Sequence, residues 1–258
     1  MGTPRPGLRI QGGKRPRNGS PIFFFMTQLF FAEYDSFDAT RPLVIFGAGG
    51  LGREVAVLVH QLNEAAAVPR WNLQGFYDDV RPATPLVGGL PYLGTTADLN
   101  AVREPLSVAV AVGSSAGRAA VAARLTSDNL FFPALVHPSV LLRDYQRLHL
   151  AAGCIVQQGC ILTCDVQLGR FTLLNLGCTV GHDAVIDDFC SLMPHANVGG
   201  HAHLAEGVYL GTNATVIQGV RVGAHTIVGA GAVVVSDLPA DCTAVGVPAK
   251  MLEKPVAA

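Results

Sequence analysis

An aliphatic residue recurs at every sixth position through the second half of this 258-residue chain. Steps of six from Leu150 to Val234 meet fifteen positions, and each of them is Leu, Ile or Val. A small or β-branched residue stands four positions after each, from Cys154 to Ala232, and only Leu238 is larger. This period predicts a triangular parallel β-helix, in which each short strand forms one side and a turn forms each corner. Three hexads make one coil of 18 residues, so the pattern predicts five coils within residues 139–258.

The same register explains most of the cysteines. Of six cysteines, Cys154, Cys160, Cys178 and Cys190 occupy the small inward position, where a thiol packs as a small hydrophobe. The other two lie outside that set, and the chain has no Cys-x-x-Cys pair. We therefore predict structural thiols without zinc or disulfides, in a reduced, cytoplasmic protein.

The preceding segment, residues 41–138, has the pattern of a small Rossmann-like α/β domain. A buried strand leads into GAGGLG at residues 47–52 and then into apolar residues of helical period. Glycines let the backbone approach a phosphate, and the N-terminus of the following helix attracts negative charge. Two later strands end at Asp78-Asp79 and at Gly113, where carboxylates can accept hydrogen bonds from ribose or base groups. A domain that only packs is the alternative; a nicotinamide dehydrogenase is disfavoured because roughly 95 residues supply one mononucleotide-binding half.

Charge, hydropathy and the first forty residues limit the classes of protein to which this chain can belong. The chain has 18 basic and 19 acidic residues, so we expect no nucleic-acid partner. No apolar run approaches the roughly 20 residues of a membrane span. Residues 1–40 are basic, rich in Gly and Pro and without period, which predicts a disordered extension. A secretory signal is the alternative, although Thr27 and Gln28 interrupt its apolar run, and Met26 is an alternative start to Met1.

One histidine and one aspartate stand in an otherwise small and aliphatic stretch, TVGHDAV. His182 is the third residue of its hexad, so the register places it near a corner with its side chain outward. Asp183 precedes His201 by one coil, and His203 is close to His201. We expect imidazoles and a carboxylate to gather on one face.

Three stretches together resemble the NeuD/PglD-type sugar acyltransferases: LNLGCTVGHDAVIDDFCSLMPHANVGG at residues 174–200, VVVSDLPADCTAVGVPAKML at residues 233–252, and the glycine-rich N-terminal unit. The similarity covers residues 42–252, with both domains in the same order. It implies a left-handed β-helix, a nucleotide-linked amino sugar held by the N-terminal domain, acetyl-CoA as cosubstrate along the solenoid groove, no metal, and a homotrimer.

The resemblance also implies site residues. The general base matches His182, because attack on a thioester requires removal of a proton and histidine titrates in the right range. Asp183 would favour the imidazolium that results, and a backbone N–H near Gly200 would polarise the thioester carbonyl. The acetyl-CoA contacts fall on Ser191, Gly200, Thr212 and Ala230, and the sugar-nucleotide contacts on Gly49, Gly50, Leu51, Asp78, Asp79 and Gly113.

Three positions depart from the family pattern. Many relatives carry histidine where Leu51 and Ser191 stand, and glycine is usual where His195 stands. Because of the departure at Leu51, the identity of the sugar does not follow from the resemblance. The departures at Ser191 and His195 leave the detailed structure of the thioester pocket undetermined.

Other functions stay open at this point. A zinc enzyme like the γ-type carbonic anhydrases needs a histidine two coils before the pair at 201 and 203, where this chain has Asp165 and Gln167. An O-acetyltransferase of sialic acid or another sugar hydroxyl, and a non-catalytic trimeric scaffold, remain alternatives. The sugar, the length of the acyl chain and the roles of His195, His201 and His203 are not determined by the sequence.

Overall fold

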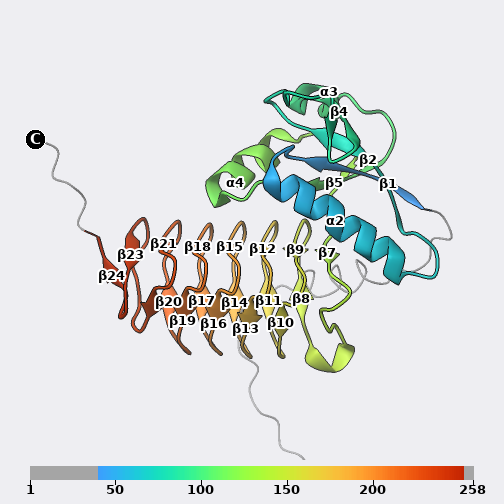
Figure 1. Ribbon diagram of the computed structural model, residues 1–258. Helices are drawn as coiled ribbons and strands as arrows, with labels where there is room; N and C mark the ends of the chain where they lie inside the picture. Colours follow the sequence, from blue (N-terminus) through green and yellow to red (C-terminus); the bar gives the residue numbers. More distant parts are fainter. Residues whose placement is uncertain (1–39, 253–258) are drawn as a thin grey trace, which may run out of the picture. The chain divides into compact units, whose positions relative to one another are not determined.

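A computed structural model describes residues 40–252 of the chain (Figure 1). The predictions made for residues 1–39, namely a disordered extension and an alternative start at Met26, lie outside the described residues. None of the helices within residues 40–252 combines the length and the apolar character that a membrane crossing requires.

The N-terminal domain is built on a six-stranded sheet of order β3-β4-β2-β1-β5-β6. Only β3 runs antiparallel to its neighbour in this sheet. The strands are β1 (Arg41–Phe46), β2 (Trp71–Tyr77), β3 (Leu86–Val87), β4 (Leu90–Gly94), β5 (Leu106–Val110) and β6 (Leu130–Phe131), and the helices are α2 (Gly50–Ala65), α3 (Thr96–Asn100) and α4 (Ser115–Arg124).

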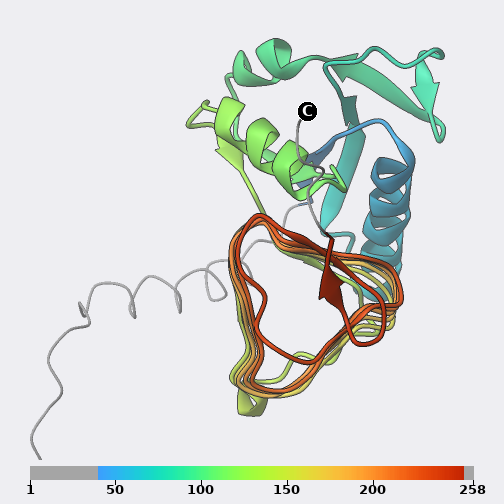
Figure 2. The same ribbon diagram turned by 90° about the vertical axis from the view of Figure 1, so that its left-hand side faces the viewer.

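Alternate residues of β1 pack on opposite faces of this sheet. Leu43 and Ile45 pack in one apolar cluster with the buried side of α2. Val44 and Phe46 pack in a second cluster with Val121 of α4. Because side chains alternate along a strand, the uninterrupted run LVIF is that of a strand covered on both faces. Figure 2 shows α2 in blue and α4 in green on opposite sides of the sheet.

The solenoid contains fifteen two-residue strands, β8 to β22, and each ends at one of the predicted aliphatic positions. Paired strands are parallel and one coil apart, as where Leu173 pairs with Ser191. The strands stack into a first face (β9, β12, β15, β18, β21), a second face (β10, β13, β16, β19, β22) and a third face (β8, β11, β14, β17, β20). Seen along the coil axis in Figure 2, the stacked coils form a triangle.

The bounds of these elements follow the hexads. They are β7 (Leu135–Val136), a 3-10 turn η1 (Asp144–Gln146), β8 (His149–Leu150), β9 (Ile155–Val156), β10 (Ile161–Leu162), β11 (Gln167–Leu168), β12 (Leu173–Leu174), β13 (Thr179–Val180), β14 (Val185–Ile186), β15 (Ser191–Leu192), β16 (Asn197–Val198), β17 (His203–Leu204), β18 (Tyr209–Leu210), β19 (Thr215–Val216), β20 (Arg221–Val222), β21 (Ile227–Val228), β22 (Val233–Val234), β23 (Thr243–Val245) and β24 (Lys250–Met251).

The inside of each coil is filled by the two sets of inward-pointing residues that the hexads predict. The aliphatic and the small residues form one buried cluster along the solenoid. Cys154, Cys160, Cys178 and Cys190 belong to it as free, buried cysteines. Burial raises the pKa of Cys154 and of Cys190 to about 12, so both stay protonated thiols at neutral pH. The predicted packing role of these four cysteines is confirmed.

Strands at both ends extend the first face beyond the hexads. β7 pairs with β9, so this sheet begins before residue 138, where the sequence places the domain boundary. At the other end, β23 continues the face and forms an antiparallel pair with β24.

The N-terminal domain packs against the first face of the solenoid. Its cluster under α2 includes Ile155 and Leu173, and its cluster on the opposite side of the sheet includes Phe171. Phe171 and Phe189 occupy equivalent turns of successive coils, and their stacked rings have centroids 5.4 Å apart. The ring of Phe132 meets Phe171 edge-on, with centroids 5.1 Å apart. This junction is therefore an apolar contact between two cores.

Candidate active site

His182 and Asp183 form the turn between β13 and β14, at the corner between the second and third faces. Asp183 adopts a left-handed φ of 58°, which turns the chain there. Nδ1 of His182 lies 2.8 Å from Oδ2 of Asp183, and the side chain of His182 is 55% exposed. Because an ionised carboxylate only accepts hydrogen bonds, this contact keeps the proton on Nδ1. Nε2 of the neutral ring is then free to accept a proton.

Two glycines shape the space around Nε2. A Cβ atom on Gly200, in the same corner of the next coil, would lie 2.6 Å from His182 Nε2. A Cβ on Gly181 would lie 2.5 Å from the backbone nitrogen of Gly200. The two turns can stack closely only because both positions lack a side chain, and Gly200 thereby leaves Nε2 of His182 without a covering side chain.

The predicted cluster of imidazoles includes His201 but not His203. Nε2 of His201 lies 3.6 Å from Oδ2 of Asp183, and the rings of His182 and His201 are perpendicular with centroids 5.0 Å apart. His203 instead faces outward from the third face, where its Nε2 lies 2.9 Å from Oδ2 of Asp187. The expectation for His203 fails because a β-strand position, unlike the turn at His201, directs its side chain away from the corner. Ligand atoms of His182, Asp183 and His201 all lie within 4.8 Å of one another, so this exposed trio has the geometry to hold a cation.

The other predicted acetyl-CoA residues border the second face, with one exception. Thr212 and Ala230 lie in turns that lead into β19 and β22, at the edge of this face opposite to His182 and Gly200. A Cβ on Gly211 would lie 2.6 Å from the nitrogen of Ala230, so this edge too is formed by closely stacked turns. Gly200, Thr212 and Ala230 thus flank one narrow strip of solenoid surface.

Ser191 is the exception, because it lies in β15 on the first face and is completely buried. Its Oγ donates to the carbonyl oxygen of Gly113 at 2.9 Å and accepts from Oγ of Ser115 at 3.0 Å. The side chain therefore joins the solenoid to the N-terminal domain and has no exposed surface to offer to coenzyme A.

Sequence reasoning missed Arg118, which lies on α4 and is 1% exposed. Its guanidinium donates to the carbonyl oxygens of Phe171 at 2.7 Å, Phe189 at 2.9 Å and Val112 at 2.6 Å, and to Oγ of Ser191 at 2.8 Å. Burial lowers the pKa of Arg118 to about 10, so the side chain is still charged at neutral pH. The helix sequence SAGRAAVAAR contains two arginines among small residues, Arg118 and Arg124, and nothing in it tells the buried one from the exposed one.

The predicted sugar-nucleotide residues gather at the carboxyl ends of β1, β2 and β5. A Cβ on Gly49 or on Gly50 would meet no atom within 4 Å, so the start of α2 faces open space. Leu51 and Gly113 are neighbours, because a Cβ on Gly113 would lie 3.9 Å from Cδ2 of Leu51. The loop and helix N-terminus have the geometry of a phosphate site.

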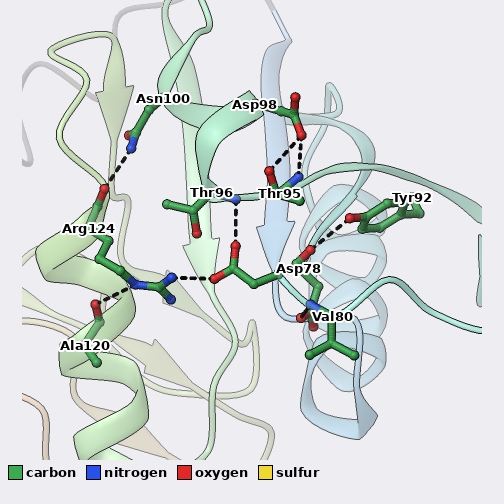
Figure 3. Close-up of polar contacts among 10 residues, drawn as sticks. Asp78, Val80, Tyr92, Thr95, Thr96, Asp98, Asn100, Ala120 and Arg124 are labelled. Atoms are coloured by element: carbon green, nitrogen blue, oxygen red, sulfur yellow. Dashed lines mark hydrogen bonds and ion pairs between the residues drawn. The ribbon is translucent and has the colours of Figure 1, made fainter.

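Both carboxylates near this loop are engaged by the protein. Oδ1 of Asp78 accepts from the backbone nitrogen of Val80 at 2.8 Å (Figure 3). Oδ2 of Asp78 accepts from the backbone nitrogen of Ala48 at 2.8 Å. Asp79 accepts from the backbone nitrogen of Thr96 at 2.9 Å and from Arg124 at 2.6 Å. Burial opposes ionisation of Asp79, but these hydrogen bonds outweigh it and lower its pKa. Asp78 holds the glycine-rich loop in place, and Asp79 ties α3 to α4.

The glycine-rich loop at residues 47–52 and His182 lie on opposite sides of the solenoid within one chain. The N-terminal domain rests on the first face, whereas His182 occupies the corner between the second and third faces (Figure 2). One chain therefore does not bring its own predicted sugar site to its own predicted base.

Comparisons with known proteins match both domains. A family model, the PglD N-terminal domain, matches residues 42–125. The GDP-perosamine N-acetyltransferase of Escherichia coli O157:H7 is 29% identical over 187 residues, which is 72% of this chain and 82% of that protein.

Two solved structures have similar folds. PerB from Caulobacter crescentus, in complex with CoA and GDP-perosamine, is 32% identical with a TM-score of 0.73, covering 83% of this chain and 99% of that one. The acetyltransferase domain of PglB from Neisseria gonorrhoeae FA1090, in complex with acetyl coenzyme A, is 30% identical with a TM-score of 0.74, covering 83% of this chain and 100% of that one.

Proposed function

The chain belongs to the NeuD/PglD family of left-handed β-helix acetyltransferases, and we propose that it transfers the acetyl group of acetyl-CoA to the amino group of a nucleotide-linked sugar. This membership confirms the fold class and the acetyltransferase activity predicted from the sequence. Free thiols and a substrate pair of acetyl-CoA and a nucleotide sugar favour the cytoplasm as its location.

His182 acts as the general base in this proposal. The neutral amino nitrogen of the sugar attacks the thioester carbonyl while Nε2 of His182 accepts a proton from it. A C–N bond forms, the C–S bond breaks, and the coenzyme A thiolate leaves and takes the proton from the imidazolium. Asp183 accepts the Nδ1–H bond throughout and stabilises the imidazolium.

One observation carries this assignment. His182 has its Nδ1 fixed by Asp183 at 2.8 Å, while its Nε2 faces a space that a side chain at Gly200 would fill. The glycine at position 200 keeps that space beside Nε2 free of a side chain, so that an amino group could approach it. A backbone N–H near Gly200 is suited to polarise the thioester carbonyl, which in other acyl transfers contributes roughly 10²–10³-fold in rate.

Acetyl-CoA is proposed to lie along the second face between Gly200 and the turns of Thr212 and Ala230. Ser191 takes no part in this contact in our proposal, since its hydroxyl is enclosed at the domain junction. The nucleotide-linked sugar is proposed to bind at Gly49, Gly50, Leu51 and Gly113, with Asp78 and Asp79 holding the loop from behind.

We propose a homotrimer in which the N-terminal domain of one chain delivers the sugar to His182 of the next. The predicted sugar site and His182 lie on opposite sides of each solenoid, which supports this arrangement. In a closed ring of three chains, the sugar site of every chain can face the His182 corner of the next chain.

The test is a panel of nucleotide-linked amino sugars with acetyl-CoA, beginning with GDP-perosamine, which similar proteins bind. Released thiol and the mass of the product are measured. The matched control is a GDP-sugar with a hydroxyl in place of the amino group. Thiol release with the amino sugar alone supports N-acetylation, and release with the hydroxyl sugar alone supports the O-acetyltransferase. No release with any member of the panel, from a folded trimer, would favour a scaffold.

A further inference from the structure

A cavity of about 430 Å³ is bordered by the C-terminal part of α2 and by the segment that leads from β7 into the solenoid. Leu62 of α2 lines it, as do Val140 and Leu142 of that segment. Leu62 packs at the margin of the N-terminal core, whereas Val140 and Leu142 belong to the solenoid core or pack against it. The cavity therefore lies between the margins of two apolar cores.

Three basic side chains line the same cavity, those of Arg70, His137 and Arg143. Within residues 40–252, no acidic side chain contributes to its lining. Arg70 and Arg143 are exposed, and in this part of the chain neither forms an ion pair. The guanidinium of Arg143 donates to the carbonyl oxygen of Leu142 at 3.0 Å. The described residues therefore leave both positive charges without a negative partner.

His137 is the buried member of this set, with 7% of its surface exposed. Its Nδ1 accepts from the backbone nitrogen of Ser139 at 3.0 Å and lies 2.8 Å from Oγ of Ser139. That oxygen accepts from the backbone nitrogen of Gly159 at 3.0 Å, so the hydroxyl proton of Ser139 is left to point at Nδ1.

These bonds determine which nitrogen of His137 carries the proton. Burial lowers the pKa of His137, so the ring is neutral at neutral pH. Because Nδ1 is an acceptor, the single proton of the neutral ring is on Nε2. No group within residues 40–252 accepts a hydrogen bond from this Nε2–H. His137 therefore brings a fixed and unused donor to the cavity that its ring lines.

We propose that this cavity binds a small amphipathic anion, which carries a carboxylate or a phosphate monoester on an apolar body. The guanidinium groups of Arg70 and Arg143 and the Nε2–H of His137 donate to the anionic group. The apolar side chains of the lining pack against the body. Such a mixture of apolar walls and a few polar groups is typical of small-molecule sites, whose volumes are roughly 300–1,000 Å³. The site shares no residue with the proposed transferase site and does not rest on the proposed function.

The charge of the lining favours an anion over a neutral or cationic ligand. The C-terminal end of α2 lies beside the cavity, and the carbonyl groups of a helix end carry only about half a negative charge. Two full positive charges outweigh it. A bound anion would contact Arg70 of the N-terminal domain and Arg143 of the segment that enters the solenoid, so its binding should stabilise the protein against heat.

The test compares four probes with the same alkyl chain on the full-length protein, by isothermal titration calorimetry. Hexanoate or hexyl phosphate should bind about tenfold more tightly than hexanol, because a charge-assisted hydrogen bond contributes at least that factor. Hexylammonium should bind more weakly than hexanol. The anion that binds more tightly identifies the anionic group as a carboxylate or a phosphate, and it should raise Tm in proportion to its saturation of the site.

Variants place the binding in this cavity. Arg70→Gln and Arg143→Gln remove one charge each from exposed side chains, so Tm should stay near wild type while affinity for the anion falls about tenfold. The matched control is Arg103→Gln, an exposed arginine that does not line the cavity and should leave the affinity unchanged. In protein labelled at the histidine ring carbons, the NMR signal of His137, assigned through His137→Gln, should shift when the anion is added.

Four results would overturn the proposal. Equal affinity for hexanoate, hexyl phosphate and hexanol would show that the basic side chains do not act on a ligand. Preference for hexylammonium would show that the carbonyl groups at the end of α2 dominate. Anion binding that Arg103→Gln weakens as much as Arg70→Gln and Arg143→Gln would reflect general surface charge. Absence of binding by every probe at millimolar concentration would show that the cavity is not a ligand site.

Discussion

Nη2 of Arg118 donates to Oγ of Ser191 at 2.8 Å across the junction between the N-terminal domain and the solenoid. Ser191 in turn donates to the carbonyl oxygen of Gly113, which belongs to the loop after β5. The loop after β5 is therefore tied to the solenoid through a buried cation that is bound by carbonyl and hydroxyl oxygens. Its position relative to the coils is determined by this junction as well as by apolar packing.

Replacing Arg118 by methionine should destabilise the protein severely. The carbonyl groups of Phe171 and Phe189 would lose the guanidinium that bonds them, and buried polar groups without partners are costly. We expect a loss of about 3–5 kcal/mol in the free energy of unfolding, measured by urea denaturation. The control is Arg124→Ala on the same helix, whose exposed ion pair with Asp79 should be worth about 1 kcal/mol or less. Equal losses in the two variants would show that the junction does not depend on Arg118.

Replacing His182 by alanine should abolish most of the turnover without unfolding the protein. Positioned acid–base catalysis contributes roughly 10²–10⁴-fold, so kcat should fall by that factor with a nucleotide-linked amino sugar. Affinity for acetyl-CoA and Tm should stay near wild type, since the side chain is exposed at a corner. Ala184→Asp, two positions along, is the structural contrast, because it would bury an unpaired carboxylate inside the coil. Nearly full turnover in His182→Ala would refute the role of the histidine.

Replacing Asp183 by asparagine should cost less than removing the base. The amide oxygen can still accept a hydrogen bond from Nδ1–H, but the imidazolium loses its charged neighbour. Proton uptake by His182 then requires a lower pH, so the acidic limb of the pH–rate profile should move downward. A profile that moves upward in Asp183→Asn would contradict the assigned electrostatics.

The solenoid and the corner at His182 could be predicted from the sequence, because a six-residue period determines which side chains point into the coil and which point out. Each hexad position has one direction, so Ala184 had to point inward and His182 outward. The contact between Asp183 and His201 followed from the same 18-residue step. In a repeat of this kind, sequence separation translates directly into spatial neighbourhood.

The junction could not be predicted, because it depends on how two domains meet. The hexad pattern places Ser191 on the outside of a coil, but it does not say that α4 covers that face. Arg118 and the carbonyl group of Phe171 are 53 residues apart and share no periodic relation. Asp78 shows a related limit, since its position after a strand is as suited to holding the loop at Ala48 as to binding ribose.

If each active site is shared between two neighbouring chains, coexpression of two inactive variants should restore transferase activity. His182→Ala keeps the glycine-rich loop at residues 47–52 and loses the proposed base. Gly49→Asp keeps the base and puts a carboxylate where the pyrophosphate is expected. This second variant should fold well, since aspartate is favoured at a helix N-cap, the φ of Gly49 is −83°, and an added Cβ meets no atom within 4 Å.

Each variant alone should form a homotrimer by light scattering and show little transferase activity. Coexpression should produce mixed trimers, in which a site takes its loop from one chain and its histidine from the next. With equal amounts and random assembly, about one quarter of the sites combine an intact loop with an intact histidine, so activity should return to about a quarter of wild type. Purified trimers that are mixed without exchange of chains should stay inactive, which controls for residual activity. If each chain used its own loop and its own His182, coexpression would restore nothing, and an active monomer would likewise refute the shared site.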